Sequence, residues 1–140
     1  MKKVVKTSHL IHASSEKVWE HIKTGEGIDK WLPVITTCQL EGEGEGAKRI
    51  CTTAQGNMLE TILEVDAEQR VFKYSIDEQP LLPIENIIGT MQVLQKDEET
   101  ELLWQLEFTL PDESSFPMVK QAIEGLYAAG ANGLAALSNS

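Results

Sequence analysis

The stretch "ELLWQLEFTLPDESSFPMVKQAIEGLYAAGANGLAAL", residues 101–137, changes its hydrophobic period once, at Pro111. Before Pro111, apolar residues alternate with more polar ones, as in a strand with one buried face: Leu102, Trp104, Leu106, Phe108 and Leu110. After Pro111, apolar and small residues recur at helical spacing: Phe116, Val119, Ile123, Leu126, Tyr127, Gly130, Leu134 and Leu137. The stretch therefore predicts a strand followed by a C-terminal helix of roughly twenty residues, with Pro117 in its first turn.

The chain from residue 34 to residue 110 reads as strands separated by turn signals, with no interval that suits a helix. Two hairpins are expected, "VITTCQL" with "AKRICTTA" around "EGEGEG", and "NMLETILEV" with "RVFKYSI" around "DAEQ". The two prolines of "QPLLP" make that segment a loop, after which come the strand "ENIIGTMQVLQ" and the turn "KDEET". This succession predicts an antiparallel sheet.

The N-terminal part predicts one strand and two short helices. Residues 3–11 mix β-branched and polar residues without a breaker, as a first strand does. Ser14 or Ser15 then caps a helix in "SSEKVWEHI" that Gly25 closes. A second short helix in "GIDKWL" ends before Pro33, whose ring restricts the preceding residue.

Length and charge restrict the class of protein. A chain of 140 residues suits one domain, residues 1–140. The net charge of −10 and the absence of a basic run argue against binding to nucleic acid or to an anionic membrane. No segment is apolar enough for membrane insertion, and "MKKVVK" is not followed by the apolar core of a signal peptide, so a cytoplasmic location is expected.

Cys38 and Cys51 flank "EGEGEG" almost symmetrically and can face each other across the hairpin. In a reducing compartment, two reduced thiols packed as small apolar groups are the expected state. His9, His12 and His21 have no spacing typical of a metal site, and "GEGEG" lacks the helix that a phosphate-binding loop requires. Neither a metal nor a cofactor is expected.

The order of one strand, two short helices, six strands and a long helix resembles the START-like superfamily (SRPBCC, Bet v 1-like), which includes the birch-pollen allergen, the polyketide cyclase/dehydrase-type proteins and the plant abscisic acid receptors. The residues that carry the likeness are "IHASSEKVWEHI", the following "WLP" and "ETILEVDAEQRVFKYSI". The resemblance implies an α+β helix-grip fold, in which a curved seven-stranded antiparallel sheet wraps around the C-terminal helix. The two short helices would cover its open end, with Trp19 and Trp31 either sealing that end or serving as ordinary core residues.

The resemblance also implies a pocket for a small hydrophobic molecule between the sheet and the helix. Its expected ligand-binding residues are Trp31, Met58, Glu60, Tyr74, Ile76, Ile87, Gly89, Met91, Trp104, Ala122, Leu126 and Gly130. Gly89 and the small residues of "AAGANG" either leave room for a ligand, or reflect a close approach of helix and sheet or a fraying C-terminus.

The position of Glu60 is open at this point. Strand periodicity favours Leu59, Thr61, Leu63 and Val65 as the buried face, which would expose Glu60. The resemblance turns Glu60 inward, where burial would raise its pKa and suit it to anchoring a ligand or to general acid/base catalysis.

Two features of the plant receptors are missing. The lysine that holds a ligand carboxylate is replaced by Leu32, and the gate loop is shortened to "AQGNM". The loop "QPLLP" is either a lid on the pocket or an ordinary exposed connection.

Three functions follow from these patterns. The favoured one is a non-enzymatic carrier or sensor that binds a small lipid, aromatic or polyketide-like molecule, as a monomer or a homodimer. The alternative is a cyclase/dehydratase-like enzyme in which Glu60 or Tyr74 transfers a proton. The third is a co-chaperone-like interaction module with an exposed apolar patch at Trp31, Leu81 and Leu82.

Overall fold

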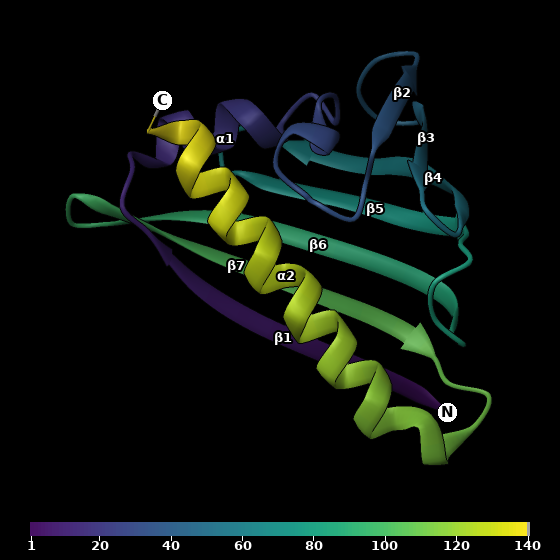
Figure 1. The fold of residues 1–140 in the computed structure, drawn as a ribbon. Coiled ribbons are helices and arrows are strands. Elements are labelled where there is room, and N and C mark those ends of the chain that lie inside the picture. The colour runs from purple at the N-terminus through teal and green to yellow at the C-terminus, as the bar shows by residue number, and fades with distance from the viewer. Residues whose placement is uncertain (140) are drawn as a thin grey trace.

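A curved antiparallel sheet of seven strands wraps around the long C-terminal helix in this computed structural model, which describes residues 1–139 (Figure 1). The strands are β1 (Lys2–Ile11), β2 (Thr37–Glu41), β3 (Lys48–Thr53), β4 (Gly56–Asp66), β5 (Val71–Glu78), β6 (Glu85–Lys96) and β7 (Glu99–Thr109). The helices are α1 (Ser15–Ile22), the short 3-10 helices η1 (Ile28–Lys30) and η2 (Glu113–Ser115), and α2 (Phe116–Ser138). Ser140, the last residue of the expected domain, lies outside the described residues.

The strands lie in the order β1-β7-β6-β5-β4-β3-β2, and every neighbouring pair is antiparallel. The first strand therefore pairs with the last, and the other strands follow their chain neighbours. With α1 and η1 between β1 and β2, this is the helix-grip fold expected from the sequence, and that prediction is confirmed.

Local sequence explains where the helices begin. Ser14 caps α1 because its hydroxyl accepts a hydrogen bond from the Lys17 backbone N–H at 3.3 Å. Pro117 occupies the first turn of α2, where its missing N–H has no intrahelical partner to lose. The helix α2 packs against β1 and α1, and its Tyr127 ring stacks on Trp104 of β7. Its buried residues are Val119, Ile123, Tyr127, Gly130, Ala131, Leu134 and Ser138.

The small residues near the end of α2 allow close packing. A Cβ atom on Gly133 would lie 1.9 Å from the Trp31 carbonyl oxygen, and one on Gly130 would lie 2.9 Å from the Trp104 ring. A Cβ atom on Gly89 in β6 would lie 2.2 Å from the Tyr74 ring. These glycines therefore allow neighbouring segments to pack closely and do not leave room for a ligand, because side chains and backbone already fill the space beside them.

The buried face of β4 is the opposite of the one favoured by strand periodicity. Met58, Glu60 and Ile62 are buried, whereas the Leu63 side chain is 40% exposed. The pairing of β4 with β5 shifts register between Leu59 and Glu60 and again between Ile62 and Glu64. The first shift is an extra residue on β5, Asp77, and leaves Met58, Glu60 and Ile62 in regular alternation; the second is an extra residue on β4, Leu63, after which Val65 is partly buried against the core. The periodicity argument assumed one unbroken alternation through Val65 and was therefore wrong for Glu60.

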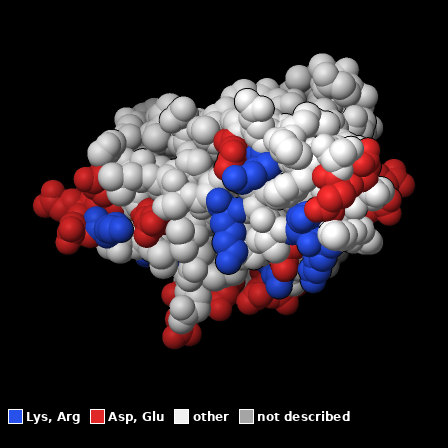
Figure 2. Space-filling model, turned by 90° about the horizontal axis from the view of Figure 1, so that it is seen from below, with Lys and Arg blue, Asp and Glu red and all other residues white. Residues whose placement is uncertain are grey.

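Acidic and basic side chains are mixed on the face seen in Figure 2, where the Lys and Arg side chains are flanked by Asp and Glu. Exposed ion pairs include Lys3 with Glu113 at 2.6 Å and Lys120 with Glu124 at 3.9 Å. Within residues 1–139, no helix is both long enough and apolar enough to span a membrane.

Candidate functional site

A cavity of about 70 Å³ lies between the inner face of the sheet, helix α2, the η1 segment and the loop between β5 and β6. Apolar side chains form most of its wall, as expected for a site that binds small apolar molecules. Its polar wall residues are few, namely Arg49, Glu60, Gln79 and the polar atoms of Trp31, Tyr74, Trp104 and Tyr127.

The structure brings most of the expected site residues to this cavity. Those that line it are Trp31, Met58, Glu60, Tyr74, Ile76, Ile87, Met91, Trp104 and Leu126. Three others are outside its lining: the Tyr74 ring covers Gly89, Gly130 packs against Trp104, and Ala122 is half-buried on α2. Trp19 is buried at the α1 side of the core, away from the cavity lining, whereas Leu32 is part of that lining.

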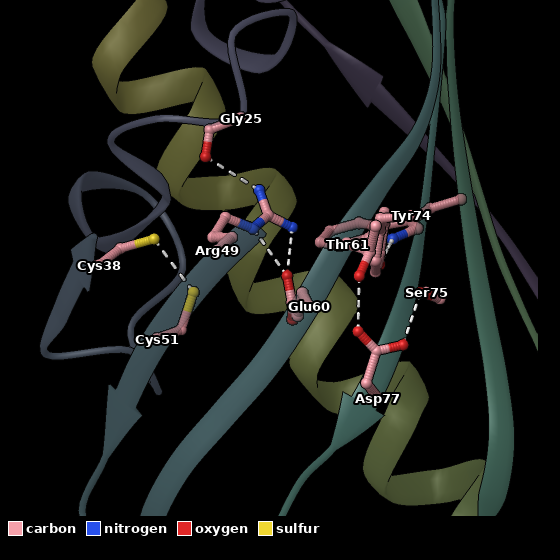
Figure 3. Close-up of polar contacts among 10 residues, drawn as sticks. Gly25, Cys38, Arg49, Cys51, Glu60, Thr61, Tyr74, Ser75 and Asp77 are labelled. Atoms are coloured by element: carbon pink, nitrogen blue, oxygen red, sulfur yellow. Dashed lines mark hydrogen bonds and ion pairs between the residues drawn. The ribbon is translucent and has the colours of Figure 1, made fainter. Parts of the chain in front are cut away.

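A buried ion pair forms one wall. Arg49 on β3 lies directly opposite Glu60 on β4, and the side chain of each is 3% exposed. The Arg49 Nε and Nη2 atoms lie 2.7 and 2.5 Å from Glu60 Oε1 (Figure 3). Arg49 Nη1 also donates a hydrogen bond to the Gly25 carbonyl oxygen at 3.1 Å. The guanidinium thus connects the sheet to the loop after α1.

Burial and pairing act in opposite directions on these two groups. Burial raises the pKa of Glu60 above its usual value, and the Arg49 charge offsets only part of that rise. Burial alone would lower the pKa of Arg49, but the adjacent carboxylate leaves it raised. Glu60 thus faces inward with a raised pKa, as the resemblance implied, and the structure adds Arg49 as a charged partner that the sequence did not reveal.

Three aromatic side chains, Tyr74, Trp104 and Tyr127, contribute further polar atoms to the wall. Trp104 Nε1 donates a hydrogen bond to the Tyr74 hydroxyl at 3.0 Å. The Trp104 ring stacks on the Tyr127 ring, with the two centroids 3.8 Å apart. The Trp31 ring contacts the Trp104 ring edge-on, with centroids 5.8 Å apart. Burial raises the pKa of both Tyr74 and Tyr127, so their hydroxyl groups stay protonated at neutral pH.

Two buried polar atoms of the cavity-lining residues lack a hydrogen-bond partner of standard geometry among the described residues. They are Trp31 Nε1 and the Tyr127 hydroxyl, although the Tyr74 hydroxyl is close enough to affect the pKa of Tyr127. Leaving a buried polar group unsatisfied costs about 1–3 kcal/mol. A bound molecule with a polar atom would relieve this cost.

The loop at residues 79–83 covers one side of the cavity. Gln79, Leu81 and Leu82 line the cavity, so the segment is more than an exposed connection. Gln79 Oε1 accepts hydrogen bonds from the Leu81 and Leu82 backbone N–H groups, both at 2.8 Å. Gln79 Nε2 donates to the Leu82 carbonyl oxygen at 2.7 Å. The glutamine side chain therefore holds the loop in place.

Sequence reasoning missed several wall residues, above all Arg49, Phe72, Gln79 and Tyr127. The signal that could have found Arg49 is the short connection between β3 and β4, since a tight hairpin specifies which residues face each other. Within residues 1–139, no cluster of three or more His, Cys, Asp or Glu side chains is arranged to hold a metal ion.

The fold and the mainly apolar cavity define the class, a helix-grip protein with an interior suited to hydrophobic ligands. The family model described as "Polyketide cyclase / dehydrase and lipid transport" matches residues 2–139. The chain belongs to this family, and its resemblance to the START-like superfamily is confirmed.

Solved structures agree with this assignment. The protein XoxI from Bacillus cereus is 28% identical, with a TM-score of 0.82 and coverage of 94% of this chain and 92% of that one. A protein from Nitrosospira multiformis is 25% identical, with a TM-score of 0.80 and coverage of 96% and 94%. Ara h 8.0201 is similar in fold, with a TM-score of 0.71 at 14% identity and coverage of 96% and 98%. A search of the curated proteins gave no match.

Proposed function

We propose that this protein is a carrier or sensor that encloses a small hydrophobic molecule between the sheet and α2. The observation that carries the proposal is the cavity, whose wall is apolar except for a few buried polar groups. The description of its family, which includes lipid transport, supports the same class of ligand. Binding would be driven by burial of apolar area, at about 25 cal/mol per Å².

The size of the cavity bears on the ligand. Pockets that enclose drug-sized molecules measure about 300–1,000 Å³, whereas this cavity has about 70 Å³. A ligand of more than a few heavy atoms therefore requires the wall to move. Two parts of the wall lie outside the strands and α2, namely the α1–η1 region and the loop at residues 79–83. We expect the loop to open, which requires breaking the hydrogen bonds of Gln79 to Leu81 and Leu82.

The polar wall atoms would orient the ligand. Replacing a buried ion pair by apolar side chains is often neutral or stabilising, so the pair of Arg49 and Glu60 is not explained by stability alone. Two further points where a polar atom of a ligand can be held are Trp31 Nε1, which has no hydrogen-bond partner among the described residues, and the Tyr127 hydroxyl group, which lies beside the Tyr74 hydroxyl group. We therefore expect an amphipathic ligand in which a small polar group accompanies a larger apolar part.

The test is binding of aromatic compounds of increasing size, toluene, indole and naphthalene, followed by tryptophan fluorescence. Trp31 and Trp104 line the cavity, so an occupant should change their emission. Native mass spectrometry of protein purified from its own host, followed by organic extraction, would identify a natural ligand.

Two variants on one strand distinguish binding in the cavity from binding at the surface. Ile87 on β6 lines the cavity, whereas its neighbour Ile88 is half-buried and absent from the lining. Ile87→Phe should weaken binding at least tenfold by filling the space, and Ile88→Phe should leave it unchanged. Equal affinity of the two variants, or no binding by the wild type, would contradict the proposal.

The enzymatic alternative is favoured by one observation, the presence of buried Glu60 beside Tyr74 in the cavity wall. In a cyclase/dehydratase-like reaction, Glu60 or Tyr74 would transfer a proton to or from the bound molecule. Glu60→Gln should then reduce turnover far more than binding, and an equal loss of both would argue against an enzyme.

The interaction-module hypothesis required an exposed patch at Trp31, Leu81 and Leu82. Trp31 is buried, and Leu81 and Leu82 are half-buried with their side chains in the cavity wall. That arrangement favours a ligand in the interior over a protein docked on the surface.

A further inference from the structure

The two cysteines face each other across neighbouring strands. Cys38 on β2 is the direct partner of Cys51 on β3, and their Sγ atoms lie 3.0 Å apart (Figure 3). Directly opposite residues in antiparallel strands have Cα atoms about 4.5–5.5 Å apart. Disulfides span Cα separations of about 4.4–6.8 Å. These two thiols can therefore be joined without moving either strand.

The two thiols differ in accessibility. Cys51 is 0% exposed, whereas Cys38 is half-buried on β2, the edge strand of the sheet. A dissolved reagent can thus reach Cys38 first, and Cys51 can be reached only by Cys38.

The pKa values of the two thiols also differ, and the more accessible thiol is the more acidic one. The hydrogen bond from Cys51 lowers the pKa of Cys38, and the Arg49 charge acts in the same direction. The same hydrogen bond and burial raise the pKa of Cys51. The thiolate, which is the nucleophile in disulfide exchange, therefore forms at the accessible sulfur.

We propose that Cys38 and Cys51 are a thiol–disulfide exchange site that low-molecular-weight disulfides oxidise reversibly. The Cys38 thiolate attacks one sulfur of the small disulfide, forms a mixed disulfide and releases one small thiolate. Cys51 then loses its proton and attacks the Cys38 sulfur, which releases the second small thiolate. Two protein thiols are oxidised, and one small disulfide is reduced to two thiols.

The site lies at the edge of the cavity wall. Cys51 pairs with Met58, which lines the cavity, and it follows Arg49 by two positions on the buried face of β3. The disulfide would join the edge strand β2 to β3, the strand that carries Arg49. This inference does not depend on ligand binding and holds for an empty cavity.

The experiment is incubation of the folded full chain with oxidised glutathione, followed by intact mass spectrometry and counting of free thiols after unfolding. The wild type should lose two hydrogen atoms and both free thiols, retain no glutathione, and recover both thiols with dithiothreitol. Cys51→Ser should keep one glutathione on Cys38, because no second thiol can displace it, while the serine hydroxyl group can still donate a hydrogen bond to Cys38. Cys38→Ala should not react while folded, because Cys51 is buried.

Two results would overturn the inference. One is a wild type that retains glutathione or both free thiols under conditions in which Cys51→Ser is modified. The other is a Cys51→Ser variant that remains unmodified, since Cys38 would then not be the attacking thiol even with a hydrogen-bond donor beside it. The wild-type measurement needs no substitution, so a variant that fails to fold leaves the main test intact.

Discussion

Removing Arg49 should make the stability of this protein strongly dependent on pH. In Arg49→Met, Glu60 stays buried but loses its charged partner and must take up a proton to remain inside. Protonating a carboxyl group of ordinary pKa near 4.3 costs about 1.4 kcal/mol per pH unit above that value. This protonation should therefore lower the free energy of unfolding by up to about 3.7 kcal/mol at pH 7 but by only about 1 kcal/mol at pH 5, apart from any cost that does not depend on pH.

The sign follows from the linkage between protons and folding. An acid whose pKa is raised in the folded state binds its proton more tightly there than in the unfolded chain, so stability falls as the pH rises between the two pKa values. In the wild type, burial also raises the pKa of Glu60, which gives the same sign with a smaller effect because Arg49 offsets part of it. Losing the hydrogen bond from Arg49 to the Gly25 carbonyl oxygen adds a cost that does not depend on pH.

Urea unfolding at pH 5 and pH 7 measures this difference. The double variant Arg49→Met/Glu60→Gln contains no carboxyl group at the site and should lose the additional pH dependence. Lys23→Met breaks an exposed pair with Glu20 and should cost less than about 1 kcal/mol at either pH. Equal destabilisation of Arg49→Met at both pH values would refute the reasoning, because Glu60 would then not be titrating with folding.

Two further pairs of substitutions test the packing around the cavity. Gly133→Ala places a Cβ atom 1.9 Å from a main-chain oxygen and should cost at least about 2 kcal/mol, whereas Gly125→Ala meets nothing within 4 Å and should stabilise α2 by up to about 1 kcal/mol. Tyr74→Phe leaves the Trp104 indole N–H without its acceptor and should cost about 1–3 kcal/mol in urea unfolding, whereas Tyr127→Phe removes a hydroxyl group that lacks a standard partner and should be nearly neutral. A reversed order within either pair would contradict the packing described above.

Much of the fold was predictable because it depends on local signals. The alternation that ends at Pro111, the glycines between β2 and β3, and the cap at Ser14 each specify an element within a few residues. The sequence also indicated that Cys38 and Cys51 can face each other, because they flank "EGEGEG" almost symmetrically, and the register of β2 and β3 pairs them.

The site was predictable only in part. Nine of the twelve expected residues line the cavity, but resemblance rather than periodicity identified them, and periodicity chose the wrong face at Glu60. Arg49 was missed because an arginine in a strand is usually exposed, and its burial depends on a carboxylate from another strand. The glycines were ambiguous because the atoms beside them, such as Trp31 and Tyr74, come from distant parts of the chain.

The sequence by itself determined the succession of strands and helices, because hydrophobic period, capping and turn residues act over a few neighbouring positions. Only the tertiary structure decided which face of β4 is buried, because an extra residue at Leu63 interrupts the pairing with β5 and ends the regular alternation of Met58, Glu60 and Ile62. It also decided that the Glu60 charge is balanced by Arg49 and that a small cavity remains beside them. Both depend on contacts between separate strands and α2, and no local pattern specifies these.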